Sequence, residues 1–310
     1  MILVADSGST KTDWRLLLPK KSKNVSCPKG ATETIALTTS GINPYFLTED
    51  EIVALLVNEL CLPFKTLGLG LDVSHVRRIY FYGAGVATQE KSMMLTAALE
   101  AVFPFARTVE SHSDLLGTAR GLCGTSPGIV GILGTGSNSC YFDGQEIVDN
   151  VPPCGFILGD EGSGAMLGRK LLSAFLKRDL PELLCQKLRY DYGLSREIIL
   201  ERVYRQQFPN RFLAQYTKFL ADNISVDVVR AIVVQSFEEF FDRNILKYSR
   251  CRDVPVHIAG SIAFYFADLL QQVALTRQIK LGIIRKSAID GIVAYHLTKT
   301  DCRDRNNEAK

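Results

Sequence analysis

The sequence lacks the features that mark membrane, secreted and metal-cluster proteins. It contains no run of about 18 apolar residues, the length that a membrane-spanning helix needs. The first strand is expected to begin at the second residue, so we expect no signal peptide. The eight cysteines include no C-x-x-C pair, which argues against a zinc or iron–sulfur site. Reduced structural thiols in a cytoplasmic protein are therefore expected.

The chain also lacks a strong excess of charge of either sign. The net charge is only +3, and the basic residues are scattered apart from a short cluster at 20–23. Such a mild balance does not indicate nucleic acid or an anionic membrane as a partner. We therefore expect small-molecule partners, and a homodimer is left open. With 310 residues, 46% of them apolar, the chain is long enough for two domains.

Glycine and small polar residues are concentrated at residues 131–139, which read G-I-L-G-T-G-S-N-S. A backbone with few Cβ atoms can bend tightly and present its N–H groups to an anion. Thr135, Ser137, Asn138 and Ser139 can add hydrogen bonds. One interpretation is a plain β-hairpin turn. The other is a phosphate-binding loop, which is favoured by the unusual stretches elsewhere in the chain.

A similar loop follows the first apolar run. Residues 2–5 are typical of a buried strand, residues 6–11 form a turn, and residues 12–18 predict a second strand. The stretch has no G-x-x-x-x-G-K-[ST] motif, so it is not a P-loop. Its hairpin could wrap a phosphate, with Asp6 holding Mg²⁺ directly or through water. A plain turn would use the same residue types.

The expected elements repeat once along the chain. In the first part we expect strands at 2–5, 12–18, 32–39, 78–82 and 108–111, with helices at 48–60, 90–102 and 114–122. In the second we expect strands at 128–133, 138–142, 145–148, 254–258 and 279–284. Helices are expected within 163–248, broken near Pro181, Gly193 and Pro209, and at 262–274 and 287–297. Each copy opens with a Gly-rich hairpin, which predicts two related α/β domains with a nucleotide cleft between them.

Four stretches resemble a known class of proteins. Residues 1–18, 131–139, 155–168 and 257–266 are similar in order and spacing to the actin–hexokinase–Hsp70 phosphotransferases. Within that class the chain resembles the N-acetylglucosamine kinases of the BadF/BadG/BcrA/BcrD ATPase family, with G-x-x-L-G-D-E-G-S-G as the most specific motif. The resemblance implies two actin-like (ribonuclease H-like) domains and a central nucleotide cleft. The implied domains are 1–117, joined by the helix 287–297, and 118–286 with a helical insertion, followed by a polar tail at 298–310.

The resemblance also assigns residues, ATP and Mg²⁺. It implies that Asp6 holds the metal and that the nucleotide is bound by Gly8, Ser9, Thr10, Lys11, Thr135, Gly136, Gly260 and Ser261. It implies that the sugar is bound by Asn43, Asp114, Ser137, Asn138 and Asp160. Asp114 matches the catalytic base, which would take the proton from the sugar hydroxyl. From the sequence alone, Asp114 could instead cap a helix, and Asp160 and Glu161 could simply begin one.

The expected function is ATP-dependent phosphoryl transfer to the 6-hydroxyl of an N-acetylated hexosamine such as N-acetylglucosamine. Two departures from the family leave the sugar open. The base stands in a His112-Ser113-Asp114-Leu115 setting, and Tyr45 and Phe46 stand near Asn43 where the family has tryptophan. One alternative is N-acetylmuramic acid, whose carboxylate would need Lys11, Arg120 or Arg169. Another is a non-kinase ATPase or activator of the BadF/BadG type.

Overall fold

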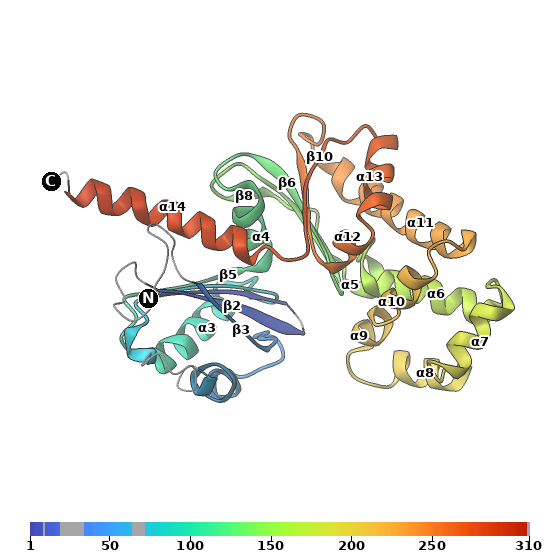
Figure 1. The fold of residues 1–310 in the computed structure, drawn as a ribbon, viewed down its shortest axis with the longest axis horizontal. Coiled ribbons are helices and arrows are strands. Elements are labelled where there is room, and N and C mark those ends of the chain that lie inside the picture. Colours follow the sequence, from blue (N-terminus) through green and yellow to red (C-terminus); the bar gives the residue numbers. More distant parts are fainter. Residues whose placement is uncertain (9, 19–33, 64–71, 309–310) are drawn as a thin grey trace. The chain divides into compact units, whose positions relative to one another are not determined.

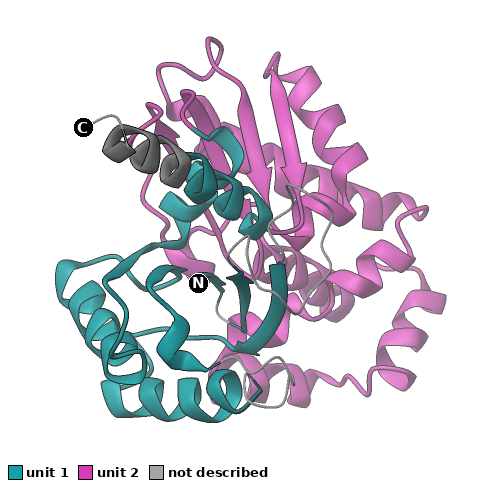
Figure 2. Ribbon diagram, turned by 60° about the vertical axis from the view of Figure 1, so that its left-hand side comes forward, with its two compact units in different colours: residues 1–124, 288–310 teal, residues 125–287 magenta. Residues whose placement is uncertain are grey.

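The computed structural model describes residues 1–8, 10–18, 34–63 and 72–308, with only the backbone for 299–308 (Figure 1). The chain divides into two compact units (Figure 2). Unit 1 comprises Met1–Gly124 and Ala288–Lys310, and unit 2 comprises Thr125–Ser287. The division after Gly124 follows a completed helix, whereas the sequence analysis placed it after residue 117. The loop expected at 19–31 lies outside the described residues.

Unit 1 is built on a five-stranded mixed sheet of order β3-β2-β1-β4-β5. Its antiparallel part contains β1 (Ile2–Ser7), β2 (Lys11–Leu17) and β3 (Thr34–Ser40). The strands β4 (Arg78–Gly83) and β5 (Thr108–Ser113) run parallel to β1. The carboxyl ends of β1, β4 and β5 therefore meet at one edge of the sheet, which is where sites gather in α/β domains.

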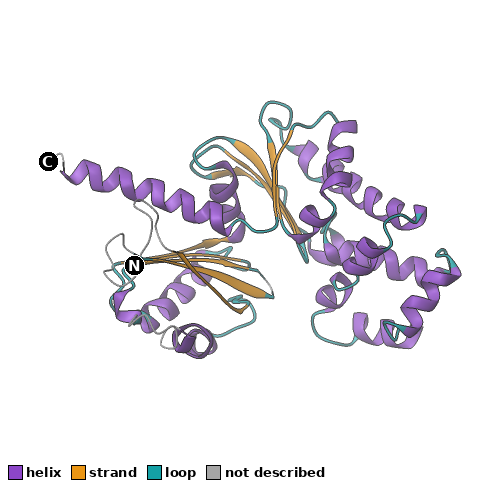
Figure 3. Ribbon diagram, in the orientation of Figure 1, coloured by secondary structure: helices purple, strands orange, loops and turns teal. Residues whose placement is uncertain are grey.

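Helices cover both faces of this sheet (Figure 3). On one face, Trp14 and Phe81 pack against α1 (Glu49–Leu55), its π-helical continuation η1 (Leu56–Cys61) and α3 (Gln89–Val102). Thr48 and Glu51 form the capping box expected at the start of α1. A 3₁₀ turn, η2 (Val73–His75), precedes β4. On the other face, Tyr80 and Tyr82 lie against residues of α14 (Ile289–Glu308).

The face that carries Tyr80 and Tyr82 is covered by α4 (Asp114–Cys123) and α14 (Ile289–Glu308). The helix α14 continues well past the end expected at 297, so the prediction of a separate tail from 298 was wrong for the backbone up to Glu308. The two helices approach closely at two glycines, because a Cβ on Gly291 would collide with the carbonyl oxygen of Gly121. This close contact fixes the helix that begins at Asp114.

Unit 2 repeats the topology of unit 1. Its sheet has the order β10-β9-β6-β7-β8, with β6 (Gly128–Leu133), β7 (Ser137–Phe142) and β8 (Ile147–Asp149) antiparallel. The strands β9 (Val256–Ala259) and β10 (Leu281–Arg285) are parallel to β6. Numbered within each unit, both sheets have the order 3-2-1-4-5, which confirms the repeat expected from the sequence and the α/β class.

Helices enlarge unit 2 between β8 and β9, and their core includes the buried Phe237, Phe240 and Phe241. The breaks expected near Pro181, Gly193 and Pro209 are confirmed. The short helix α5 was not expected. No helix among the described residues is long and apolar enough to cross a membrane. The helices of unit 2 are α5 (Gly155–Leu158), α6 (Gly164–Lys177), α7 (Glu182–Tyr190), α8 (Arg196–Tyr204), α9 (Pro209–Ala214), α10 (Thr217–Asp222), α11 (Asp227–Arg243), η3 (Ile245–Lys247), α12 (Ser261–Tyr265) and α13 (Ala267–Thr276).

Candidate active site

The hairpin between β1 and β2 closes tightly at Gly8. The N–H of Gly8 donates to the carbonyl oxygen of Lys11 at 2.9 Å, and among the described residues a Cβ on Gly8 would meet only that oxygen, at 3.7 Å. Gly8 itself is exposed. The Lys11 ammonium forms an ion pair with Asp13 at 2.7 Å, and Thr10 accepts a backbone bond from Gly41. Ser9 lies outside the described residues.

Two buried hydroxyl groups hold the next part of the chain against this hairpin. Ser7 Oγ and Thr12 Oγ1 are hydrogen-bonded at 2.7 Å, and Ser7 Oγ also accepts from the N–H of Ile42 at 3.1 Å. Asn43 follows directly, with its side-chain oxygen accepting from the N–H of Tyr45. A Cβ on Gly85 would collide with the Asn43 side chain. Asn43 therefore lies at the carboxyl end of β4, and Ser7 and Thr12 are positioning residues that the sequence analysis missed.

Asp114 occupies the carboxyl end of β5 and the first turn of α4. The cap of this helix is Ser113, whose Oγ accepts from the N–H of Leu116, so Asp114 is not the cap. The Asp114 carboxylate accepts from the N–H of Leu115 at 2.8 Å. Burial, followed by the charge of the nearby Asp6 carboxylate, raises the pKa of Asp114 to about 6. Unit 1 thus brings Asp6 and Asp114 together.

The basic residues considered for a substrate carboxylate are all engaged elsewhere. Lys11 pairs with Asp13, and Arg120 donates to the hydroxyl of Tyr82 at 2.9 Å. Arg169 donates to the carbonyl oxygens of Phe156 and Ile157, both at 3.1 Å. The partly buried His112 lies 3.4 Å from the Glu110 carboxylate, in keeping with a packed strand residue.

In unit 2, the Gly-rich loop between β6 and β7 rests on the start of α6. The N–H of Gly164 donates to the carbonyl oxygen of Gly134 at 2.8 Å, and that of Ala165 donates to Thr135 at 3.0 Å. The turn itself closes through the N–H of Gly134 and the carbonyl oxygen of Gly136. These hydrogen bonds attach the loop to the first turn of α6.

The carboxylate of Asp160 lies against the same loop. It accepts from the N–H of Ser137 at 3.3 Å, and a Cβ on Gly136 would lie 3.0 Å from Asp160 Oδ2. Burial is the main cause that raises the pKa of Asp160. Asn138 lies beside them, its side-chain oxygen accepting from the N–H of Ser139. Unit 2 therefore brings Gly136, Ser137 and Asp160 into one site.

Gly260 joins this group through the end of β9. Its φ of +122° and the collision that a Cβ would make with the carbonyl oxygen of Leu133 both require glycine here. Leu133 directly precedes the Gly-rich loop, so Gly260 lies beside it. Ser261 begins the five-residue helix α12. Thus the two stretches of unit 2 expected to bind the nucleotide are adjacent.

The sequence analysis considered Glu161, next to Asp160, only as part of a possible helix start, whereas α6 begins at Gly164 with Ser163 as its cap. Glu161 is only 5% exposed and forms an ion pair with Arg243 at 2.8 Å and a hydrogen bond with Asn244 at 3.2 Å. These three residues line a pocket of about 100 Å³ together with Asp160 and Ser137. The G-D-E-G motif marked Glu161, but no sequence signal linked it to the distant end of α11.

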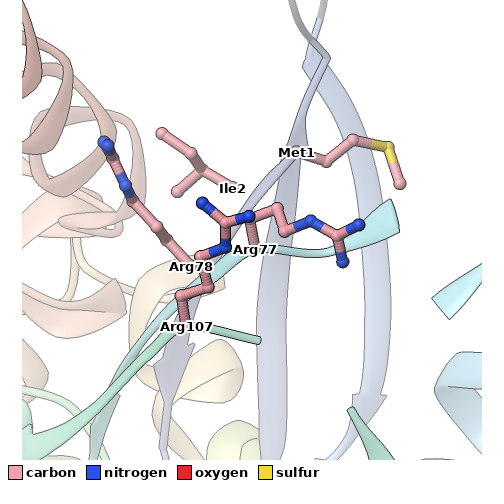
Figure 4. A pocket seen from close by; sticks show the side chains of 5 residues that line it. All are labelled: Met1, Ile2, Arg77, Arg78 and Arg107. Atoms are coloured by element: carbon pink, nitrogen blue, oxygen red, sulfur yellow. The ribbon is translucent and has the colours of Figure 1, made fainter. Parts of the chain in front are cut away.

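A larger hollow lies at the other end of the unit 1 strands. It has a volume of about 330 Å³ and is lined by Met1, Ile2, Arg77, Arg78 and Arg107, whose side chains are drawn in Figure 4. These residues lie at the amino ends of β1 and β4 and just before β5. Asp6 and Asp114 lie at the carboxyl ends, so this hollow is separate from the candidate site.

The carboxylates of unit 1 fit the needs of Mg²⁺. This ion usually keeps several waters and binds one or two carboxylates together with substrate phosphates. Within the described residues no group of three or more His, Cys, Asp or Glu side chains could hold a metal alone. Asp6 with Asp114 nearby suits a metal that arrives with a nucleotide.

The comparisons with known proteins found matches among solved structures. No family model matches the chain, and no curated protein matches it. Among solved structures, it is similar to the proposed N-acetylglucosamine kinase of Porphyromonas gingivalis, with 44% identity, a TM-score of 0.86, and coverage of 96% of this chain and 98% of that one.

More distant structures share the fold. A proposed N-acetylglucosamine kinase of Chromobacterium violaceum is 18% identical, with a TM-score of 0.63 and coverage of 95% and 98%. The ROK hexokinase of Thermus thermophilus is 13% identical, with a TM-score of 0.54 and coverage of 97% and 99%. These two show the fold alone. Because of the much higher identity over nearly both full lengths, this chain belongs to the same family as the Porphyromonas gingivalis protein, a family of sugar kinases with the actin-like fold.

Proposed function

We propose that this sugar kinase transfers the γ-phosphoryl group of ATP to the 6-hydroxyl of an N-acetylated hexosamine such as N-acetylglucosamine. The assignment to the BadF/BadG/BcrA/BcrD group is part of the same proposal. The sugar class is supported by the name of the 44% identical Porphyromonas gingivalis protein. The chemistry is supported above all by Asp114, a partly buried carboxylate with a raised pKa at the carboxyl end of a parallel strand.

Asp114 is the proposed base. A carboxyl with a pKa of about 6 is ionised at neutral pH, yet it binds a proton more readily than an ordinary aspartate. It can therefore orient the sugar hydroxyl and accept its proton as the phosphoryl group moves. The Leu115 N–H holds the carboxylate in place, and Ser113 caps the helix without competing for it.

The remaining roles are proposed from the resemblance to the kinase family. The turn at Gly8 and the loop at Thr135 and Gly136 are proposed to bind the phosphates through backbone N–H groups. Gly260 and Ser261 are proposed to lie against the adenosine. Asp6 would hold Mg²⁺, which neutralises charge on the phosphates when it is bound. Asn43, Ser137, Asn138 and Asp160 supply the donors and acceptors that a sugar requires.

A coupled assay of ADP release tests the proposal. The panel should contain N-acetylglucosamine, N-acetylmannosamine, N-acetylmuramic acid, glucosamine and glucose, each with Mg²⁺-ATP, and the product should be analysed for the phosphorylated position. We expect N-acetylglucosamine to give the highest kcat/KM and a 6-phosphate. A higher kcat/KM for N-acetylmuramic acid would mean that this sugar, and not N-acetylglucosamine, is the substrate. ATP hydrolysis that no sugar stimulates would instead favour the ATPase or activator alternative.

A further inference from the structure

The hollow at the amino ends of β1 and β4 is a candidate for a second binding site. We propose that it binds a small molecule that carries more than one phosphate group. The hollow belongs to unit 1, has a volume of about 330 Å³, and is lined by Met1, Ile2, Arg77, Arg78 and Arg107 (Figure 4). Ile2 precedes Asp6 by four residues on β1, a distance of about 13 Å at the strand rise of about 3.3 Å per residue. Binding in this hollow is therefore independent of the proposed kinase site.

The sheet places two of the arginines side by side. The N–H of Arg77 donates to the carbonyl oxygen of Met1 at 2.9 Å, and the N–H of Arg107 donates to the carbonyl oxygen of Arg77 at 2.8 Å. These bonds continue the parallel pairing of β1, β4 and β5. Neighbouring strands lie about 4.8 Å apart, so Arg77 and Arg107 are adjacent at this edge. Like charges opposite each other are destabilising, and a bound anion would relieve their repulsion.

The hollow has a positive potential. Among the residues that the structure describes, no Asp or Glu lines it, and neither Arg77 nor Arg107 forms an ion pair. Burial, followed by the positive charges of Arg77 and Arg78, lowers the pKa of the Met1 amino group. Both observations favour an anionic ligand.

The backbone holds the side chain of Arg77 in place. Its Nη1 donates to the carbonyl oxygen of Ser74 at 2.6 Å and to that of Phe105 at 3.1 Å. A guanidinium has five N–H donors in a planar fork, so Nε and Nη2 of Arg77 can still bind an anion. Phosphate oxygens match this fork, and a side chain that is already held loses little freedom on binding. Arg77 and the adjacent Arg107 are therefore suited to a phosphate group.

The arrangement of the side chains favours a ligand with several charges. In Figure 4, Arg107 lies between Arg77 and Arg78, whose side chains extend to opposite sides of it. The three guanidinium groups are thus spread along the hollow and do not converge on one point. Its volume of about 330 Å³ is typical of a small-molecule pocket, for which the range is roughly 300 to 1,000 Å³. A single inorganic phosphate would leave most of this space empty, whereas a bisphosphate reaches more than one arginine and its organic part can contact Met1 and Ile2.

Calorimetric titration with fructose 1,6-bisphosphate and with inorganic phosphate tests the proposal. The buffer contains no Mg²⁺, so that metal-dependent binding of phosphates near Asp6 does not contribute. We expect the bisphosphate to bind at least about 10-fold more tightly than phosphate, and Arg107→Gln to weaken its binding by roughly 10-fold or more, since a charge-assisted hydrogen bond is lost. Arg196→Gln, at an exposed position of unit 2, is the matched control and should bind as the wild type does. Absence of binding to the wild type, or equal affinity in Arg107→Gln and Arg196→Gln, would overturn the proposal.

Thermal unfolding separates loss of the ligand from loss of the fold. Arg107 is exposed, and its side chain forms no hydrogen bond or ion pair with the described part of the chain, so Arg107→Gln should fold normally. Without ligand its Tm should equal or exceed that of the wild type, because repulsion from Arg77 is removed. The bisphosphate should raise the Tm of the wild type and of Arg196→Gln, but not that of Arg107→Gln. A lower ligand-free Tm for Arg107→Gln would assign Arg107 to stability, and binding of a single-stranded RNA without binding of the bisphosphate would assign the hollow to nucleic acid; either result would contradict the proposal.

Discussion

The carboxylate of Asp6 raises the pKa of Asp114, although Asp6 lies on β1, Asp114 follows β5, and β4 runs between these two strands. The sheet register explains their proximity, because Asp6 lies opposite Tyr82 on β4, and Tyr82 lies opposite His112 on β5. Two residues on from His112, the chain reaches Asp114. Strand pairing thus places a proposed metal ligand close to a proposed base, and the Asp6 charge affects the protonation of Asp114.

Asp114→Asn should abolish most turnover without loss of the fold. Asparagine keeps the shape and the acceptor for the Leu115 N–H, but it cannot take a proton. We expect kcat to fall by about 10² or more, the usual scale of general-base catalysis, while ATP still binds. Ser113→Ala is the matched control, because it removes the helix cap, costs about 1 kcal/mol of stability and leaves the base in place. Near-normal kcat for Asp114→Asn in steady-state assays would exclude Asp114 as the base.

The pH dependence of the reaction should report the same group. A base with a pKa of about 6 is lost as the pH falls below that value, so kcat/KM for the sugar should decline on the acid side of about pH 6. Because Asp6 raises the pKa of Asp114, Asp6→Asn should move this decline to lower pH, even if it also weakens metal binding. An acid limb that stays at the same pH in the variant would show that the two carboxylates do not interact.

The raised pKa of Asp114 also has a cost in stability. The pKa rises from 3.8 to about 6 in the folded protein, so the ionised form is disfavoured by folding. Ionisation of Asp114 therefore lowers the free energy of unfolding of the protein as the pH rises from about 4 to about 6. Above about pH 6 the free energy of unfolding remains lowered by the full amount. At pH 8, Asp114→Asn should be more stable than the wild type by up to about 3 kcal/mol, since one pKa unit is worth 1.36 kcal/mol. Denaturant unfolding at pH 8 and pH 4 measures the difference, which should vanish at the lower pH.

The sequence predicted those parts of the protein that are determined by local pattern. The repeated strand order, the capping box at Thr48 and the breaks at Pro181 and Pro209 follow from periodicity and from the preferences of single residues. The stretches rich in glycine and small polar residues at 6–11 and 131–139 marked the two hairpin loops. The sequence could not show that Ser113 caps α4 while Asp114 remains available, because either residue type can cap a helix.

The sequence could not predict contacts between distant segments, because such contacts are not determined by local pattern. Glu161 and Asn244 are 83 residues apart, and their hydrogen bond depends on how α11 packs. The length of α14 was also missed, because its polar C-terminal half has the composition of a frayed end. Ser7 and Thr12 form ordinary strand positions in the sequence, and only the pairing of β1 with β2 places their hydroxyl groups together.

The two hairpin loops should respond differently to an added methyl group. A Cβ on Gly136 would lie 3.0 Å from Asp160 Oδ2 and would have to displace that carboxylate. Among the described residues, a Cβ on Gly8 would meet only a carbonyl oxygen, at 3.7 Å. We expect Gly136→Ala to raise the KM for the sugar as well as weaken ATP binding. Gly8→Ala should weaken ATP binding only, through lost room for the phosphate. Calorimetry with ATP and with sugar separates the two, and unchanged ATP affinity in both folded variants would exclude the phosphate loops.

The contact between α4 and α14 gives a prediction whose sign is decisive. In an unconstrained helix, Gly291→Ala should stabilise the protein by about 1 kcal/mol, because alanine favours the helical conformation. Here the new Cβ would collide with the backbone oxygen of Gly121, and backbone atoms cannot move aside as a flexible side chain can. Overpacking of this kind typically costs about 1–3 kcal/mol. We therefore expect a net loss of stability and a lower Tm, and, because α4 begins at Asp114, a lower kcat as well.

Ala294→Gly, at an exposed position of the same helix, is the control and should destabilise by about 1 kcal/mol without a change in kcat. A higher Tm for Gly291→Ala would mean that the two helices can separate freely and that their close approach does not position the base.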